Sequence, residues 1–187
     1  MSRLTDRVID PTRVTQMHNV EELELLEEYA RKSRGPIANL GCHRGVSAAV
    51  LALASTHRVY SVDTYDWDSA APGAPTPTNK EIAYSLWASL GLERQISQCV
   101  GTTDEWAVRL SDVRFGFVFI DADHGQLACM ADFVNWSPLI VPGGWVAFHD
   151  TDNKRVAKVL AKVEAFLPVV AERNRIKVLQ IPDNGSI

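Results

Sequence analysis

Short apolar runs alternate with amphipathic stretches along most of the chain, from Pro36 onward. The apolar runs have the length of buried parallel strands and lie at 37–40, 58–62, 96–100, 117–120 and 145–148. Between them, apolar residues at helical spacing predict helices at 46–54, 81–90, 104–110, 127–136 and 156–166. Two further apolar runs, at 168–171 and 176–181, predict a closing hairpin.

A helix is also predicted before the first strand. Asn19 is typical of an N-cap, and Glu22 stands three residues later, as in a capping box. Apolar residues recur at helical spacing as far as Ala30, and Gly35 with Pro36 ends the helix. We therefore divide the chain into an N-terminal segment with this helix, residues 1–35, and a main domain, residues 36–187.

Strands that alternate with helices indicate crossover connections and a mostly parallel sheet. Right-handed crossovers place helices on both faces, so the expected fold is α/β: a three-layer Rossmann-like sandwich with an antiparallel C-terminal strand. In such sheets, ligands bind at the carboxyl ends of the strands. Polar groups and glycines follow nearly every predicted strand, at 41–45, 63, 101–103, 121–124 and 149–152. These positions are the expected site.

Composition limits the partners. The net charge of −4 and the pI near 5.7 disfavour a nucleic-acid surface, which draws on clustered Lys and Arg. The three cysteines are widely spaced, which favours buried reduced thiols over a zinc site or disulfides. The first residues lack the apolar core of a signal peptide, and no apolar run is long enough for a bilayer. We expect a cytoplasmic protein with no membrane partner.

The turn after the first predicted strand carries Gly41 and Gly45 and opens a helix, whose N-terminus favours an anionic group. The dinucleotide fingerprint G-x-G-x-x-G is not satisfied here. A glycine turn that serves only strand–helix packing is the alternative. Asp63, at the end of the second predicted strand, can accept hydrogen bonds from ribose hydroxyls, or can be a helix cap or a solvated acid.

Five segments in order, NLGCHRGVS, YSVD, CVGTT, FIDADH and LIVPGGWVAFHD, resemble the motifs of class I S-adenosylmethionine-dependent methyltransferases. The nearest resemblance is to the small O-methyltransferase-like group with cephalosporin-hydroxylase-type and catechol-O-methyltransferase-type proteins, from Pro36 to the C-terminus. For cofactor binding the resemblance implies Asn39, Gly41, Gly45, Asp63, Thr102, Thr103 and Asp121. We add His43, because it lies inside the glycine turn.

The resemblance also implies roles for these positions. Gly41 and Gly45 would flank the methionine part of the cofactor, Thr102 and Thr103 would lie near the adenine, and Asp121 would lie near the sulfonium. Asn39 stands where the family usually has an acid. It keeps an acceptor but lacks the negative charge that would favour the cofactor's ammonium group.

In the metal-dependent relatives, acids at the positions of Asp121 and Asp150 bind a divalent cation. The third ligand lies beside the second acid, and we take His149 for it, with Thr151 and Asp152 as the other candidates at this position. Such a set suits Mg²⁺ or another divalent cation, which would orient an acceptor hydroxyl.

His124 stands where the catechol-type enzymes have a lysine base, and it is the candidate general base, with Asp121 as the other catalytic candidate. The alternative is that these polar residues cap turns without binding a metal. We expect His18 and His57 to be surface or packing residues.

The leading hypothesis is an S-adenosylmethionine-dependent methyltransferase that acts on the hydroxyl of a small molecule, assisted by a divalent metal. The alternatives are an inactive cofactor-binding accessory protein, suggested by Asn39, and a nicotinamide-dependent oxidoreductase, which the missing fingerprint glycine argues against. The proline-rich stretch 64–79 predicts an exposed loop, either a lid over the acceptor or an ordinary surface loop. The N-terminal helix is a candidate surface for forming a homo-oligomer.

Overall fold

The computed structural model describes residues 18–66 and 77–184, which contain a seven-stranded sheet in the order β3-β2-β1-β4-β5-β7-β6. Strands β1 to β5 pair in parallel, and β7 is antiparallel to both β5 and β6. The strands are β1 (Ile37–Leu40), β2 (Val59–Asp63), β3 (Ile96–Val100), β4 (Phe115–Ile120), β5 (Ile140–Phe148), β6 (Val169–Arg173) and β7 (Ile176–Gln180). The predicted Rossmann-like sheet with an antiparallel C-terminal strand is confirmed.

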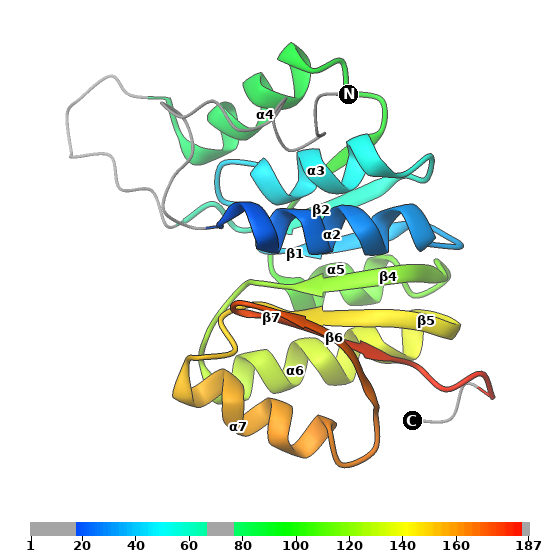
Figure 1. The fold of residues 1–187 in the computed structure, drawn as a ribbon. Coiled ribbons are helices and arrows are strands. Elements are labelled where there is room, and N and C mark those ends of the chain that lie inside the picture. The colour runs from blue at the N-terminus through cyan, green and yellow to red at the C-terminus, as the bar shows by residue number, and fades with distance from the viewer. Residues whose placement is uncertain (1–17, 67–76, 185–187) are drawn as a thin grey trace.

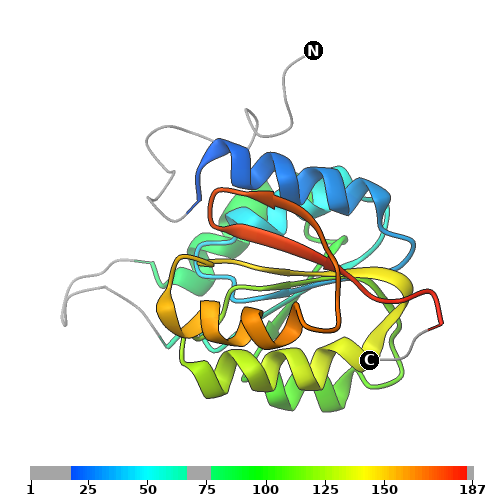
Figure 2. The same ribbon diagram turned by 60° about the horizontal axis from the view of Figure 1, so that its bottom comes forward.

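Helices cover both faces of this sheet, which gives the expected three layers (Figures 1 and 2). They are α2 (Val20–Lys32), α3 (Val46–Ala54), α4 (Asn79–Ser89), α5 (Thr103–Arg109), α6 (Gln126–Trp136) and α7 (Lys154–Val163), with a short 3₁₀ helix η1 (Ser137–Leu139). Buried residues of α2, α3 and α4 form one apolar core against the sheet, and those of α5, α6 and α7 form the other. The sheet is thus apolar on both faces.

Strand β4, at the centre of the sheet, shows why a central strand has an unbroken apolar sequence. All six of its residues are buried, because helices cover both of its faces. Phe117 and Phe119 pack into the core under α2 and α3, whereas Val118 and Ile120 pack into the core on the other face. Alternate residues therefore belong to different cores.

Helix α2 begins with the predicted capping box: the Asn19 side chain accepts from Glu22 N, and the Glu22 carboxylate accepts from Asn19 N. The apolar stripe of α2 is fully buried, with Leu23 and Leu26 at 0% exposure, and it packs into the same core as α3. This burial fixes the N-terminal end of α2 beside the end of β5, where Glu22 contacts His149.

The largest difference between the structure and the sequence expectations is in one strand. Strand β5 begins at Ile140, ahead of the predicted start at Trp145, although Pro142, Gly143 and Gly144 resemble a turn. Gly143 adopts a left-handed φ of 73°, and a side chain on Gly144 would crowd the Gly116 carbonyl. These residues therefore allow the strand to continue through an irregularity opposite Phe115 and Phe117.

Other expectations concern smaller features. Helix α4 begins at Asn79 with Thr78 as its N-cap, slightly earlier than expected. Most of the predicted loop at 64–79 lies outside the described residues. The three cysteines are buried and free, as expected. None of the helices in the described segments has the length and apolar content that a membrane crossing needs.

Asp132 of α6 is a buried acid, and burial with the nearby charges of Asp104 and Asp123 raises its pKa to about 6. The folded protein therefore holds this proton more tightly than the unfolded chain, so the stability contributed by Asp132 falls as the pH rises from about 4 to 6. We expect Asp132→Asn to increase the free energy of unfolding at pH 7 by about 2–3 kcal/mol, and much less at pH 4. Urea unfolding at both pH values measures this, with the exposed Asp112→Asn as the control. Equal effects of the two substitutions would contradict the assignment.

Candidate functional site

The carboxyl ends of the parallel strands surround a cavity of about 690 Å³. Backbone hydrogen bonds continue the ladder past the strands, because Gly41 N donates to Val62 O, Asp121 N to Leu40 O, and His149 N to Ile120 O. These bonds hold the residues after each strand side by side. Of the predicted site residues, those that line the cavity are Gly41, His43, Asp63, Thr102, Thr103, Asp121, His124, His149 and Asp150.

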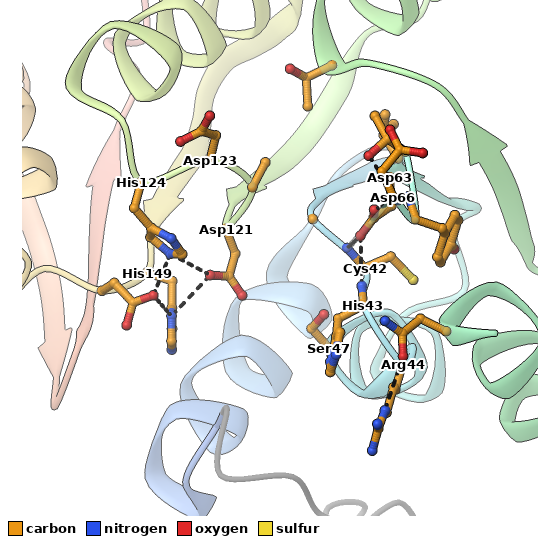
Figure 3. Close-up of a pocket in the computed structure, with 18 of the residues that line it drawn as sticks. Cys42, His43, Arg44, Ser47, Asp63, Asp66, Asp121, Asp123, His124 and His149 are labelled. Carbon is orange, nitrogen blue, oxygen red and sulfur yellow. Dashed lines mark hydrogen bonds and ion pairs between the residues drawn. The ribbon is translucent and has the colours of Figure 1, made fainter. Parts of the chain in front are cut away.

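Asp63 ties the end of β2 to the turn after β1 (Figure 3). Its Oδ2 accepts from Cys42 N at 2.7 Å and from His43 N at 2.8 Å, and its Oδ1 accepts from Tyr65 N at 2.6 Å. Three backbone N–H groups thus find their partner in one carboxylate. Since a carboxylate offers about four acceptor positions, roughly one remains for a ligand hydroxyl.

The two glycines of the turn serve packing. Gly41 has a left-handed φ of 86°, and a side chain there would overlap the main-chain carbonyl of Asp121. Gly45, with a φ of 85°, lies against Trp87, whose Nε1 donates to the Gly45 carbonyl at 2.9 Å. Gly41 also lines the cavity, whereas Gly45 lies behind its wall. The packing alternative therefore describes Gly45 well.

Asn39 also lies behind the cavity wall rather than in it. Its side chain is fully buried, and Nδ2 donates to Gly41 O at 2.9 Å and to Ser61 Oγ at 3.0 Å. Its Oδ1 is buried without a hydrogen-bond partner among the described residues. In this arrangement the hydrogen bond from Asn39 to the Gly41 carbonyl fixes the start of the glycine turn.

Thr102 and Thr103 begin α5 at the far end of this wall. Thr102 is the N-cap of the helix, and its hydroxyl accepts from Glu105 N at 3.2 Å. His43 and Tyr65, on the same side of the cavity, have left-handed φ angles of 48° and 59°. With Asp150, three of the four described non-glycine residues in that conformation line the cavity, and such backbone strain gathers at functional sites.

The opposite wall is a cluster of acids and imidazoles (Figure 3). His149 Nδ1 lies 3.1 Å from Asp121 Oδ1 and 3.2 Å from Asp150 Oδ2. His124 Nε2 lies 2.6 Å from Asp150 Oδ2 and 3.9 Å from Asp121 Oδ1. These contacts pair each imidazole with both carboxylates. Converging donors of this kind suit a cation.

The cluster extends into the protein through the other nitrogen of His149. Nε2 lies 3.3 Å from Glu22 Oε2 and 3.2 Å from His18 Nδ1. The Arg175 guanidinium joins Glu22 Oε1, at 3.2 Å, to Asp150 Oδ1, at 2.7 Å. Of the two expectations for His18, surface or packing residue, the structure shows packing: its side chain is 9% exposed and lies against the rings of Phe119 and His149. It also belongs to this cluster and lines the cavity.

These contacts control the pKa values of the cluster. Burial would lower the pKa of His149, but the carboxylates of Asp121, Asp150 and Glu22 raise it to about 11. Contacts with Asp121 and Asp150 raise the pKa of His124 to about 10. A base must be neutral before it accepts a proton, so in this arrangement His124 is a donor. Its predicted role as base requires those carboxylates to be engaged elsewhere.

The same environment acts on the other members. Burial would raise the pKa of Glu22, but contacts with His149, the Asn19 backbone and Arg175 lower it to about 2. Burial lowers the pKa of His18. Glu22 is therefore ionised and His18 is neutral at pH 7.

Several residues of the site escaped the sequence reasoning. They are His18, Glu22, Arg44, Ser47 and Arg175. Ser47 lies two residues after Gly45, in the first turn of α3, so its position was a usable signal. Glu22 was assigned only to the capping box, and its contact with Arg175 joins segments 153 residues apart.

A family model described as a methyltransferase domain matches residues 38–151, and the chain belongs to this family. The matched region runs from the second residue of β1 past the end of β5 and ends beside Asp150. It therefore includes both walls of the cavity apart from the N-terminal and C-terminal contributions. This membership favours methyl transfer over the nicotinamide-dependent alternative. A search of curated proteins found no match to this chain.

Solved structures share the fold over nearly the whole chain. An O-methyltransferase from Bacillus cereus in complex with SAH (S-adenosylhomocysteine) is 16% identical, with 95% of this chain and 90% of that chain covered and a TM-score of 0.68. The O-methyltransferase TomG from Streptomyces achromogenes, involved in tomaymycin synthesis and solved with SAM, is 17% identical, with coverage of 97% and 91% and a TM-score of 0.70. An SAH-bound methyltransferase from Podospora anserina is 11% identical, with coverage of 94% and 85% and a TM-score of 0.69.

Asp63→Ala removes the acceptor for three backbone N–H groups, so we expect it to lower the free energy of unfolding by about 1–3 kcal/mol. Urea denaturation measures the loss. Asp66→Ala, at an exposed acid three residues away, is the matched control and should stay within about 0.5 kcal/mol of the wild type. If the two variants were equally stable, Asp63 would not hold the turn.

Proposed function

We propose that this protein transfers a methyl group from S-adenosylmethionine to a hydroxyl group of a small-molecule acceptor, with a divalent cation bound at the acceptor. The observation that carries the proposal is the cavity, which joins a turn-and-carboxylate wall to a cluster of acids and imidazoles. Methyl transfer needs those two walls to face one space, because the nucleophile must approach the methyl carbon in line.

The first wall fits a nucleoside cofactor. Gly45 is the N-cap of α3 and offers no side-chain cap, so the first N–H groups of the helix are left to water or to a ligand. A carboxylate such as that of the methionine part suits this end of the helix, and Ser47 lines the cavity there. The remaining acceptor position of Asp63 suits a ribose hydroxyl. Bound S-adenosylmethionine supplies an activated methyl group on its sulfonium.

The second wall fits a cation. Two carboxylates, Asp121 and Asp150, converge with an imidazole, and the nitrogens of His124 and His149 that face them have no hydrogen-bond partner in the described part of the chain. We assign the cation to Asp121, Asp150 and one imidazole: His149, as the resemblance implies, or His124, whose ligand atom lies within 4.8 Å of both acids. A divalent cation there supplies a Lewis acid that lowers the pKa of an acceptor hydroxyl.

The protein's own groups then orient the acceptor. His124 is the most exposed member of the group, at 41%, so it is the side chain best placed to meet an acceptor that enters the cavity. We assign to it the contact with the reacting hydroxyl, either as the base or as a donor. Asp121 lies between both walls, since its main chain packs on Gly41 and its carboxylate belongs to the cluster.

Ligand binding tests the cofactor half of the proposal. A ligand that binds the folded state and not the unfolded state raises the melting temperature. At about a hundredfold excess of S-adenosylhomocysteine over its dissociation constant, we therefore expect a rise of about 5–10 °C. NAD, which also carries an adenosine, is the matched control and should give no rise. Absence of a shift with S-adenosylhomocysteine at millimolar concentration, or an equal shift with NAD, would count against the proposal.

Substitution of the cation ligands tests the other half. With labelled S-adenosylmethionine and a panel of small hydroxyl compounds, we expect Asp150→Asn to reduce methyl transfer by about a hundredfold or more, and a chelator to have the same effect on the wild type. Asp152→Asn should retain activity, because this acid, although a candidate ligand from the sequence, is exposed and is not among the residues that line the cavity. Undiminished transfer in Asp150→Asn and in the presence of a chelator would remove the cation from the mechanism.

A further inference from the structure

The imidazole of His149 has a second nitrogen, on the side away from the pocket carboxylates and toward the start of α2. This Nε2 lies 3.2 Å from His18 Nδ1 and 3.3 Å from Glu22 Oε2, and those two atoms are 3.9 Å apart. We propose that these three atoms form a second cation site, of the kind that binds Zn²⁺ or a similar transition-metal ion. The site goes beyond the methyl-transfer proposal and does not depend on it.

The spacing fits one small cation. Bonds of about 2.0–2.2 Å at tetrahedral angles place neighbouring ligand atoms about 3.3–3.5 Å apart. Two of the three separations have about this value, and the third requires a shift of about half an ångström. The three ligand atoms come from side chains with 9%, 0% and 3% exposure, so the site is formed inside the protein and not on its surface.

The atoms of these side chains that face away from the site are also held. His149 Nδ1 faces Asp121 Oδ1 and Asp150 Oδ2, and the His18 Nε2 atom lies 3.5 Å from Asp121 Oδ2. Metal-binding histidines typically have their second nitrogen against a carboxylate in this way, which fixes the tautomer and the direction of the ring. Both histidines of the proposed site thus share Asp121 as their outer partner.

Glu22 is held in the same manner. Its Oε1 accepts from the Arg175 side chain and backbone, at 3.2 Å and 3.3 Å, which leaves Oε2 toward the two imidazoles. Oε2 also accepts from Asn19 N at 3.0 Å and from Arg175 Nη2 at 3.4 Å. A cation would displace the longer of these contacts. The positive charge of Arg175 lies mainly toward the far oxygen of Glu22 and toward Asp150.

The chemistry of the donors selects the class of ion. Two imidazoles with one carboxylate suit Zn²⁺, Fe²⁺, Co²⁺ or Ni²⁺, whereas Mg²⁺ and Ca²⁺ prefer oxygen ligands and more of them. Around this site, the carboxylates of Glu22, Asp121 and Asp150 face the guanidinium of Arg175 and the imidazoles of His124 and His149. A divalent cation therefore binds by replacing the proton on His149 Nε2.

His149 links this site to the pocket. A cation at Nε2 takes the place of the proton there, and the neutral imidazole that results keeps its other proton on Nδ1, as a donor toward the pocket carboxylates. The pocket cation is then held by Asp121, Asp150 and His124, which is the group whose ligand atoms lie within 4.8 Å of one another. If the inner site is filled, His124 and not His149 is the imidazole ligand of the pocket cation.

Zinc titration of the chelator-treated full chain tests this proposal. Calorimetry should show a tight Zn²⁺ site in the wild type, and His18→Gln should weaken it at least about tenfold. Co²⁺ is the spectroscopic probe, because its absorption reports low-coordinate nitrogen ligation in the wild type and should change in His18→Gln. His57→Gln is the matched control, at a histidine outside the cluster, and should bind zinc as the wild type does.

Two further variants make the test decisive. Glu22→Gln should also weaken zinc binding, and circular dichroism checks that this buried substitution leaves the protein folded. His124→Gln removes a pocket ligand only, and it should leave the inner site intact. Lack of zinc uptake by the wild type, unchanged affinity in His18→Gln, or loss confined to His124→Gln would overturn the proposal. Methyl transfer by Asp150→Asn is measured separately, so failure of either proposal is distinguishable.

Discussion

The structure around the cavity depends on one buried imidazole. His149 places Nδ1 between Asp121 and Asp150 and Nε2 beside Glu22, so carboxylates after β4, after β5 and in α2 meet at a single ring. Buried charges are costly unless they are paired. The pairing of these groups therefore holds the end of the sheet, the first turn of α2 and the β6–β7 turn, which supplies Arg175, in one arrangement.

The two walls of the cavity are built by different physical means. On one wall, backbone N–H groups of the glycine turn are gathered on the Asp63 carboxylate, and left-handed residues accept strain to form the turn. On the other wall, side-chain charges are gathered on His149. The backbone hydrogen bonds at Asp63 give the first wall a fixed shape. The charged groups around His149 give the second wall a site that can exchange protons for a cation. That division suits the methyl transfer proposed above, in which a cofactor lies on the first wall and an acceptor on the second.

Most of the fold could be predicted from the sequence because it follows from local periodicity. Buried strands read as apolar runs, and residues directly after them must meet at one edge, so Asp63, Asp121 and His149 could be assigned to a common site. The capping box at Asn19 is equally local. The early start of β5 could not be read, because Gly143 and Gly144 are typical of turns and only their packing shows that they continue a strand.

The inner half of the cluster could not be predicted for a related reason. Glu22 and Arg175 have local explanations, as a capping residue and a turn residue, and their contact depends on how α2 and the C-terminal hairpin pack on the sheet. Asn39 is an intermediate case. The period of two in β1 places it on the same face as Ile37, inside a core, so its position behind the cavity wall could have been inferred.

A crystal structure with S-adenosylhomocysteine tests the central claim, that both walls serve one reaction space, most directly. The account predicts ribose density at Asp63, the adenine near Thr102, and the thioether sulfur directed toward Asp121 and the imidazole cluster. A nucleoside bound outside the cavity, or one whose sulfur points away from that cluster, would contradict it.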